Sequence, residues 1–212
     1  MSKPKLIIFA SGTREGGGSG FENLVNTSRS GILNAEIIAV VSNYEHGGVR
    51  GRADRLGIPF IYFSKLLQGD EVAEKYKEIA KGSDFVALSG WLKLVEGLDP
   101  KTTFNIHPGP LPRFGGDGMY GHYVHEAVME AYKKGWVTRS AVSMHFVTEG
   151  YDRGPVFFSH EVPIFPDDTA ETLAKRVNEA EHKWQPIVTN QVLAGEISWD
   201  GVDPSSLKSP YI

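Results

Sequence analysis

The chain has 212 residues, of which 41% are apolar and 23% charged, an ordinary composition for a globular protein in water. A formal net charge of −4 does not argue for nucleic acid or an anionic membrane as a partner, and no apolar run approaches the length of a membrane span. The absence of cysteine excludes disulfides and thiolate metal sites. We therefore expect one domain, residues 1–212, in the cytoplasm, without nucleic-acid or membrane partners. A homodimer stays open.

Strand-like and helix-like patterns alternate through the first half of the chain. Continuous apolar runs predict buried strands at residues 5–11, 35–41, 59–63 and 85–88. Helical patterns lie between them, at residues 21–28, 49–56 and 70–80. This alternation is typical of βαβ units with right-handed crossovers.

The second half departs from this alternation. After a short strand ending at His107, a helix is predicted at 122–134 and an antiparallel pair of strands at 139–147 and 155–162. Apolar residues at helical spacing predict a last helix over 172–193, which Pro186 should kink or interrupt. The fold class is therefore α/β: a single-domain, open, mostly parallel twisted sheet with helices on both faces and the last strands partly antiparallel.

The strand that ends at Pro108 carries two polar side chains. Asn105 and His107 are two residues apart, so they point to the same face at a strand end, where α/β sheets bind ligands. An asparagine NH2 group can donate to an oxyanion, and a histidine can exchange protons near neutral pH. The alternative is structural, with Asn105 capping the loop and His107 making one hydrogen bond.

Two carboxylates are candidate partners for this pair. Asp152 lies in a turn-like segment, and its alternative role is that of an ordinary turn residue. If it contacts His107, 45 residues away, it should raise the pKa of the imidazole and keep it protonated. Glu181 lies beside the apolar stripe of the last helix. It either faces solvent or faces the cleft, where it could hold an amine.

A glycine-rich loop, residues 16–20, follows the first strand and precedes the first helix. Its backbone N–H groups could approach a phosphate at the helix N-terminus. The loop lacks the Gly-Lys-Ser/Thr of a P-loop, and Asn23 stands where a dinucleotide fingerprint needs glycine. The loop therefore indicates a monophosphate site, with an unoccupied flexible loop as the alternative. The histidines set up no metal constellation, and we expect no metal.

Together, Asn105-Ile106-His107-Pro108, the downstream His145-Phe146-Val147-Thr148, and Asp152 before Gly154-Pro155 resemble the folate-dependent formyltransferase family. The resemblance extends from Leu6 to Leu193. It implies a Rossmann-like fold and 10-formyltetrahydrofolate as co-substrate, with small molecules as the only partners. The implied reaction is formyl transfer to the amine of glycinamide ribonucleotide in purine biosynthesis.

The resemblance also implies roles for individual residues. The amine attacks the formyl carbon directly, Asn105 and protonated His107 stabilise the oxyanion, and Asp152 keeps His107 charged. The N-terminal half, about 1–100, would bind phosphate, and the C-terminal half, about 101–195, would hold the catalytic and folate sites. The implied acceptor-binding residues are Gly18, Ser19, Gly20, Gly90 and Glu181. The implied folate-binding residues are Leu92, Lys93, Leu94, Val95, His145 and Val147, with backbone groups of Leu92 and Val95 bonding the pterin ring.

Two departures from the family pattern bear on the acceptor. The stretches 13–17 and 115–121 are longer than is usual in the family. A formyltransferase for another amine, such as an amino-sugar nucleotide, is therefore one alternative. A non-catalytic nucleotide- or folate-binding module is another, although simple binding does not require Asn105, His107 and Asp152 together.

Overall fold

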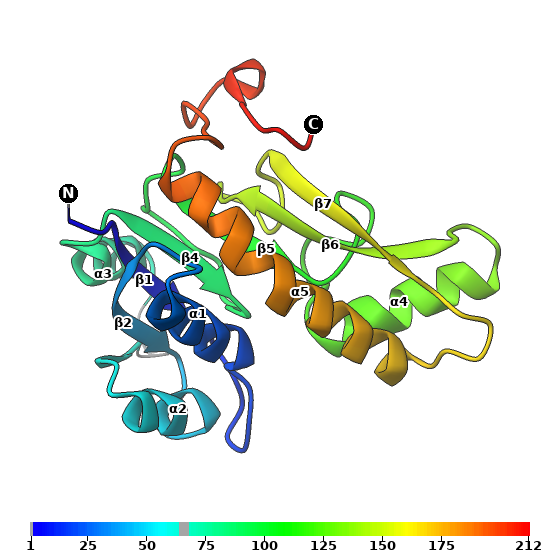
Figure 1. Ribbon diagram of the computed structural model, residues 1–212, viewed down its shortest axis with the longest axis horizontal. Helices are drawn as coiled ribbons and strands as arrows, with labels where there is room; N and C mark the ends of the chain where they lie inside the picture. The colour runs from blue at the N-terminus through cyan, green and yellow to red at the C-terminus, as the bar shows by residue number, and fades with distance from the viewer. Residues whose placement is uncertain (1, 64–67) are drawn as a thin grey trace.

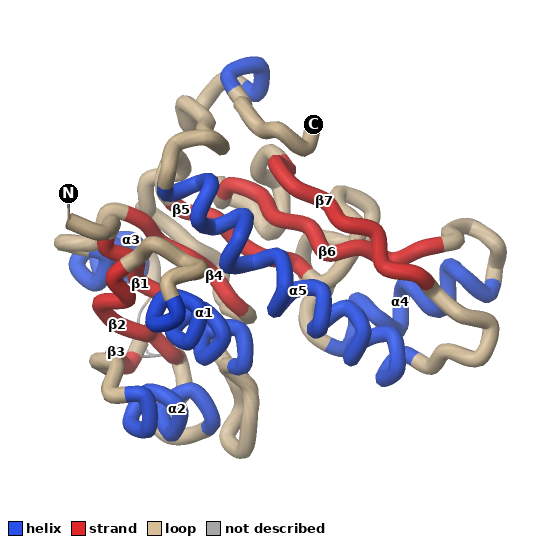
Figure 2. Tube along the Cα trace, in the orientation of Figure 1, coloured by secondary structure: helices blue, strands red, loops and turns tan. Residues whose placement is uncertain are grey.

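In a computed structural model, which describes residues 2–63 and 68–212, the strands form one seven-stranded sheet in the order β3-β2-β1-β4-β5-β6-β7 (Figures 1 and 2). The strands are β1 (Lys5–Phe9), β2 (Glu36–Ser42), β3 (Phe60–Tyr62), β4 (Phe85–Ser89), β5 (Thr103–His107), β6 (Arg139–Phe146) and β7 (Val156–Pro163). The helices are α1 (Ser19–Ser30), α2 (Gly48–Leu56), α3 (Asp70–Ala80), α4 (His122–Lys133), α5 (Ala170–Leu193) and the short 3₁₀ helix η1 (Pro204–Ser206).

The direction of the strands changes twice, at the last two strands of the sheet. The five strands from β3 to β5 pair in parallel, whereas β6 pairs antiparallel with β5 and β7 antiparallel with β6. This confirms the predicted α/β class with antiparallel last strands. Both halves of the chain contribute strands to the same sheet.

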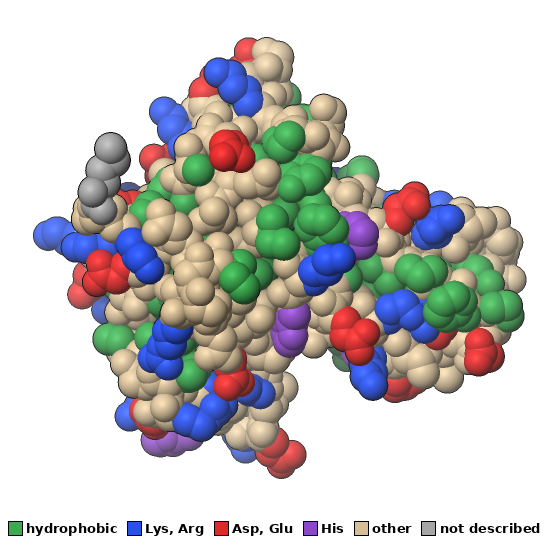
Figure 3. Space-filling model, in the orientation of Figure 1, with side chains coloured by type: hydrophobic (Ala, Val, Ile, Leu, Met, Phe, Trp, Pro, Cys, Tyr) green, Lys and Arg blue, Asp and Glu red, His purple; other side chains and the backbone are tan. Residues whose placement is uncertain are grey.

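Helices cover both faces of the sheet, as predicted. On β1, Leu6 and Ile8 belong to the larger core cluster, which includes buried side chains of α1, α2, α4 and α5. Ile7 and Phe9 point the opposite way, into a smaller core that includes Tyr76 of α3. Outside these cores, charged side chains of both signs are scattered over the visible face, and no basic area dominates it (Figure 3).

Helix α5 crosses one face of the sheet and continues through Pro186, so of the expected kink or interruption the interruption does not occur (Figure 1). Proline has no N–H for the carbonyl of His182, four residues earlier, which therefore needs another donor. Asn23 Nδ2 of α1 donates to that carbonyl at 2.7 Å. Of the helices in the described part of the chain, none combines the length and apolar character that crossing a bilayer requires.

The link between Asn23 and the freed carbonyl can be tested by a double-mutant cycle. Asn23→Ala should lower the free energy of unfolding by about 1–3 kcal/mol, because it leaves a half-buried carbonyl without a partner. In a Pro186→Ala background, where residue 186 supplies its own N–H, the same change should cost less than about 1 kcal/mol. Urea denaturation of the four proteins measures both costs. Equal costs in the two backgrounds would contradict this account.

Candidate functional site

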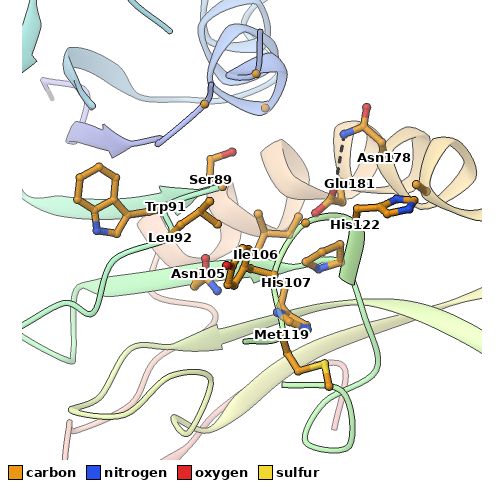
Figure 4. A pocket seen from close by; sticks show the side chains of 18 of the residues that line it. Ser89, Trp91, Leu92, Asn105, Ile106, His107, Met119, His122, Asn178 and Glu181 are labelled. Carbon is orange, nitrogen blue, oxygen red and sulfur yellow. Dashed lines mark hydrogen bonds between the residues drawn. The ribbon is translucent and has the colours of Figure 1, made fainter. Parts of the chain in front are cut away.

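A cavity of about 470 Å³ opens at the carboxyl ends of β4 and β5 (Figure 4). This is the edge at which open α/β sheets bind ligands. Its walls come from the glycine loop before α1, the ends of β4 and β5, the loop at 116–121 and the inner face of α5. The predicted site residues that line it are Gly18, Ser19, Gly20, Gly90, Leu92, Asn105, His107, Asp152 and Glu181.

The predicted contact between His107 and Asp152 is present. His107 Nδ1 lies 3.6 Å from Asp152 Oδ2, and both side chains are largely buried. The other ring nitrogen, Nε2, lies 2.7 Å from the carbonyl oxygen of Phe114. Because a carbonyl can only accept, Nε2 carries the hydrogen and donates it. In the neutral ring, Nδ1 therefore holds a lone pair and is the nitrogen that can exchange a proton.

The protonation of His107 differs from the sequence-based expectation. Burial lowers the pKa of His107 more than Asp152 and the Phe114 carbonyl raise it, so the pKa lies below its ordinary value. The imidazole is therefore neutral at pH 7, and the expectation that Asp152 keeps it protonated is wrong. Burial also raises the pKa of Asp152, but the side chains of His145 and His107 and the N–H of Gly116 together bring it below its usual value.

Asn105 is held from behind by His145, which stands opposite it on β6. Asn105 Nδ2 lies 3.1 Å from His145 Nε2 and donates to it. The same amide nitrogen makes only a long contact, 3.4 Å, with Asp152 Oδ1. The two N–H groups of Asn105 are thus directed at His145 and Asp152, and the one that makes the long contact with Asp152 is the more weakly held. His145 was expected to bind folate, but it is buried beneath Asn105 and does not line the cavity.

The turn that carries Asp152 has an unusual backbone. Asp152 has φ of 53°, the left-handed region, which aspartate tolerates better than most residues. Its carboxylate accepts the backbone N–H of Gly116 at 3.0 Å. A Cβ at Gly115 would lie 2.9 Å from the Cβ of Asp152, so only glycine allows this close approach. Two loops thus meet at Asp152.

The glycine loop reaches the cavity at the N-terminus of α1. Gly18, in the left-handed conformation, precedes the helix, and Ser19 and Gly20 form its first turn. Backbone N–H groups at this position have no helical partners and can bind an anion. Ser19 Oγ lies 3.2 Å from His182 Nε2 on α5, and Arg52 of α2 donates to the Gly17 carbonyl at 2.9 Å. The loop is therefore fixed from both sides.

Glu181 faces the cavity rather than solvent (Figure 4). Its carboxylate accepts one hydrogen bond, from Asn178 Nδ2 at 3.3 Å. Although part of the residue remains exposed, burial of the carboxyl raises its pKa to about 7. A cationic or amine ligand would favour the ionised form.

The expected folate-binding segment contacts the cavity only in part. Leu92 lines it, but the Leu92 N–H donates to Ser11 Oγ at 3.0 Å, so this group is not free to bond a ring as expected. The remaining expected residues lie outside the lining of this cavity: Lys93, Leu94, Val95 and Val147. Val95 is buried in the smaller core, and Val147 packs against that core.

Several cavity residues were missed from the sequence. They are Ser89, Met119, Tyr120, Tyr151, Asn178, His182 and Gln185. Asn178, His182 and Gln185 lie at helical spacing around Glu181, a signal that could have placed them on its face. His125 also lines the cavity, and its burial lowers its pKa to about 4. Within residues 2–63 and 68–212, no three acidic or histidine side chains converge as metal ligands.

Comparisons with known proteins find close likenesses. Residues 4–189 match the formyl transferase family. The chain is 36% identical to a chloroplastic phosphoribosylglycinamide formyltransferase of Arabidopsis thaliana, over 94% of this chain and 70% of that protein. It is 30% identical to the phosphoribosylglycinamide formyltransferase of Bacillus subtilis, over 89% of this chain and 94% of that one. Glycinamide ribonucleotide transformylase 1 from Symbiobacterium toebii shares the structure with a TM-score of 0.80 at 26% identity, over 94% and 92%.

The protonation of His107 can be measured directly by NMR of its ring nitrogens. We expect a pKa below the ordinary 6.5, and a neutral form with its hydrogen on Nε2. Asp152→Asn should lower the pKa further, because the carboxylate raises it. Asp117→Asn, which removes another carboxylate from the same cavity, is the matched control and should leave the pKa unchanged. A rise in pKa on loss of Asp152 would refute this reading.

Proposed function

Because the chain belongs to the formyl transferase family, whose match covers residues 4–189, we propose that it transfers a formyl group from 10-formyltetrahydrofolate to the amine of glycinamide ribonucleotide. This reaction is a step of purine biosynthesis, and we place it in the cytoplasm, since both substrates are water-soluble. One observation carries the proposal: Asn105, His107 and Asp152 share a single cavity with the glycine loop before α1 and with Glu181.

Of the two proposed substrates, the acceptor is the one whose groups match the cavity lining best. A ribose phosphate would place its phosphate on the free N–H groups of Gly18–Gly20, next to His182. Its amine would approach Glu181 on the same helix, whose carboxylate has one hydrogen-bond partner among the described residues. The named relatives from Arabidopsis and Bacillus support this acceptor.

The donor would enter from the side of Leu92, which is 39% exposed and reaches the cavity from the loop after β4. The formyl carbon would then stand near Asn105 and His107. Lys93, which is exposed on the same loop, would lie toward the acidic tail of the folate. Val95, Leu94 and Val147 would support this loop from below rather than form its cavity surface.

The reaction requires stabilisation of a negatively charged oxygen and transfer of a proton, and these residues can supply both. Attack of the amine on the formyl carbon forms a C–N bond and puts negative charge on the formyl oxygen. The Asn105 N–H that makes only the long contact with Asp152 would turn to donate to that oxygen, and loss of one such donor typically lowers kcat by about 10²–10³. Neutral His107 accepts the proton of the attacking nitrogen at Nδ1. It returns this proton to the folate nitrogen as the bond from that nitrogen to the formyl carbon breaks.

Asp152 would stabilise the imidazolium that exists between these two proton transfers. Its carboxylate lies 3.6 Å from His107 Nδ1 and has a pKa below its usual value, so it is ionised at pH 7. A carboxylate so placed acts on the charged intermediate more than on the neutral ground state. Its loss should therefore lower kcat more than it raises either KM.

The assay for tetrahydrofolate release by absorbance tests the proposal. With 10-formyltetrahydrofolate as donor, glycinamide ribonucleotide should be formylated, and Asp152→Asn should reduce kcat by at least about 100-fold. Asp117→Asn serves as the control, because it removes a cavity carboxylate other than that of Asp152. Turnover of an amino-sugar nucleotide, with none of glycinamide ribonucleotide, would replace the proposed acceptor. No turnover with any amine, together with tight folate binding, would favour the binding-module alternative.

The acceptor role of Glu181 predicts a dependence on pH. Because the pKa of Glu181 is about 7, its ionised fraction grows between pH 6 and 8, and the KM for the acceptor should fall over this range. Glu181→Gln should remove that part of the dependence and raise the acceptor KM at pH 8 by about 10-fold or more. The donor KM should not change. Comparing the two proteins cancels the titration of the substrate itself.

Asn178→Ala provides a matched variant for this test. Its amide hydrogen bond lowers the pKa of Glu181, so its removal should move the midpoint of the acceptor KM profile to higher pH. An unchanged profile in Glu181→Gln would show that the carboxylate does not face the amine.

A further inference from the structure

The loop between β1 and α1 contains a tight turn that is closed by its own hydrogen bonds. The N–H of Thr13 donates to the carbonyl of Gly16 at 2.8 Å. In return, the N–H of Gly16 donates to the hydroxyl oxygen of Thr13 at 2.9 Å. Residues 13–16 therefore form one closed turn. From this turn the chain continues to Gly18, which precedes α1 and lines the cavity.

The first turn of α2 packs directly against this closed turn (Figure 1). Gly48, the first residue of α2, donates its N–H to the carbonyl of Thr13 at 3.2 Å. A Cβ at Gly48 would lie 2.3 Å from the carbonyl carbon and oxygen of Gly16, so the two backbones touch where no side chain fits. Gly48 is helical and its φ is not positive, so the helix itself would accept any residue there. The contact with the loop is what requires glycine.

Two further residues of α2 extend this contact toward α1. The buried side chain of Val49 fills the space beside Gly18. Arg52 Nε donates to the carbonyl of Gly17 at 2.9 Å. Residues 48–56 of α2, all of which the structure describes, do not themselves line the cavity. Helix α2 therefore acts on the cavity only through the loop that it holds.

A loop of this composition needs such support. Residues 16–18 are three consecutive glycines, and glycine has more backbone freedom to lose than any other residue. If the loop were free, an anion would have to order it on binding, which would weaken the affinity. A loop that is already held with its N–H groups toward the cavity avoids this loss.

We propose that Gly48 is a positioning residue for the acceptor. By allowing α2 to touch the loop, it holds the N–H groups of residues 18–20 in the arrangement that binds the acceptor phosphate. The inference rests on the proposed function in taking this phosphate to be part of the acceptor. The formyl donor, which would enter beside Leu92, does not use this contact.

Gly48→Ala tests the proposal, because alanine is preferred to glycine in a helix and conflicts here only with the loop. The Kd of ribose 5-phosphate, which carries the phosphate without the amine, should rise about 10-fold or more by isothermal titration calorimetry. The acceptor KM should rise with it, while kcat and the donor KM stay within about twofold. Gly51→Ala is the matched control, since a Cβ at this position of α2 meets nothing within 4 Å. It should change none of these quantities.

A second variant approaches the same contact from the loop. Thr13→Val keeps the shape of the side chain but removes the hydroxyl that accepts the Gly16 N–H, so it should also weaken the binding of ribose 5-phosphate. Thr13→Ser restores the hydroxyl and should recover the binding. Circular dichroism shows whether Gly48→Ala folds, and if it does not, this pair of variants decides.

Three results would overturn the proposal. The first is an unchanged Kd for ribose 5-phosphate in folded Gly48→Ala, or in Thr13→Val where Gly48→Ala does not fold. The second is an equal rise of donor and acceptor KM, which would indicate general loosening of the site. The third is a wild-type protein that transfers formyl groups without binding ribose 5-phosphate. Failure of the wild-type protein to transfer a formyl group would refute the proposed function instead, and the binding measurements would still decide whether α2 orders the loop.

Discussion

The antiparallel pairing of β5 with β6 is the constraint on which the site depends. It sets Asn105 opposite His145 and His107 opposite Ser143. A sixth parallel strand would have needed a crossover connection and would have ended at the same edge of the sheet as β5. The antiparallel β6 instead ends beside Phe104, and the turn that follows it reaches back with Asp152 to Asn105 and His107. Asp152 thereby lies 3.4 Å from Asn105, 3.3 Å from His145 and 3.6 Å from His107.

The same packing decides how His107 can work. Its side chain is only 4% exposed, and removal from water disfavours the charged ring more than one carboxylate at 3.6 Å favours it. A permanently charged imidazole would be a good oxyanion partner but could not accept a proton. A neutral ring beside Asp152 can take a proton when the attacking amine becomes acidic, and the carboxylate then stabilises the ion pair. Burial thus favours a proton relay over a fixed positive charge.

Much of the fold and part of the site could be predicted from the sequence. The strands and helices could be located from apolar runs and their spacing, because an element that is buried on one or both faces carries apolar residues at the matching positions. Asn105 and His107 were placed together because alternation along one strand is a local rule. The role of His145 was not predictable in this way, since an alternating strand residue looks the same whether it meets a ligand or an amide. Likewise, nothing in the sequence near Leu92 shows that Ser11 takes its N–H.

The contact between α1 and α5 bears most directly on which acceptor is selected. Both halves of the chain contribute to this wall, because His182 of α5 contacts Ser19 at the glycine loop. Asn23, one turn further along α1, bonds the carbonyl that Pro186 leaves free in α5. The glycine loop and Glu181 are therefore held in one rigid arrangement. With the phosphate and the amine bound as we propose, such an arrangement would select acceptors by the separation of these two groups, so acceptors of other lengths would be rejected by distance rather than by chemistry.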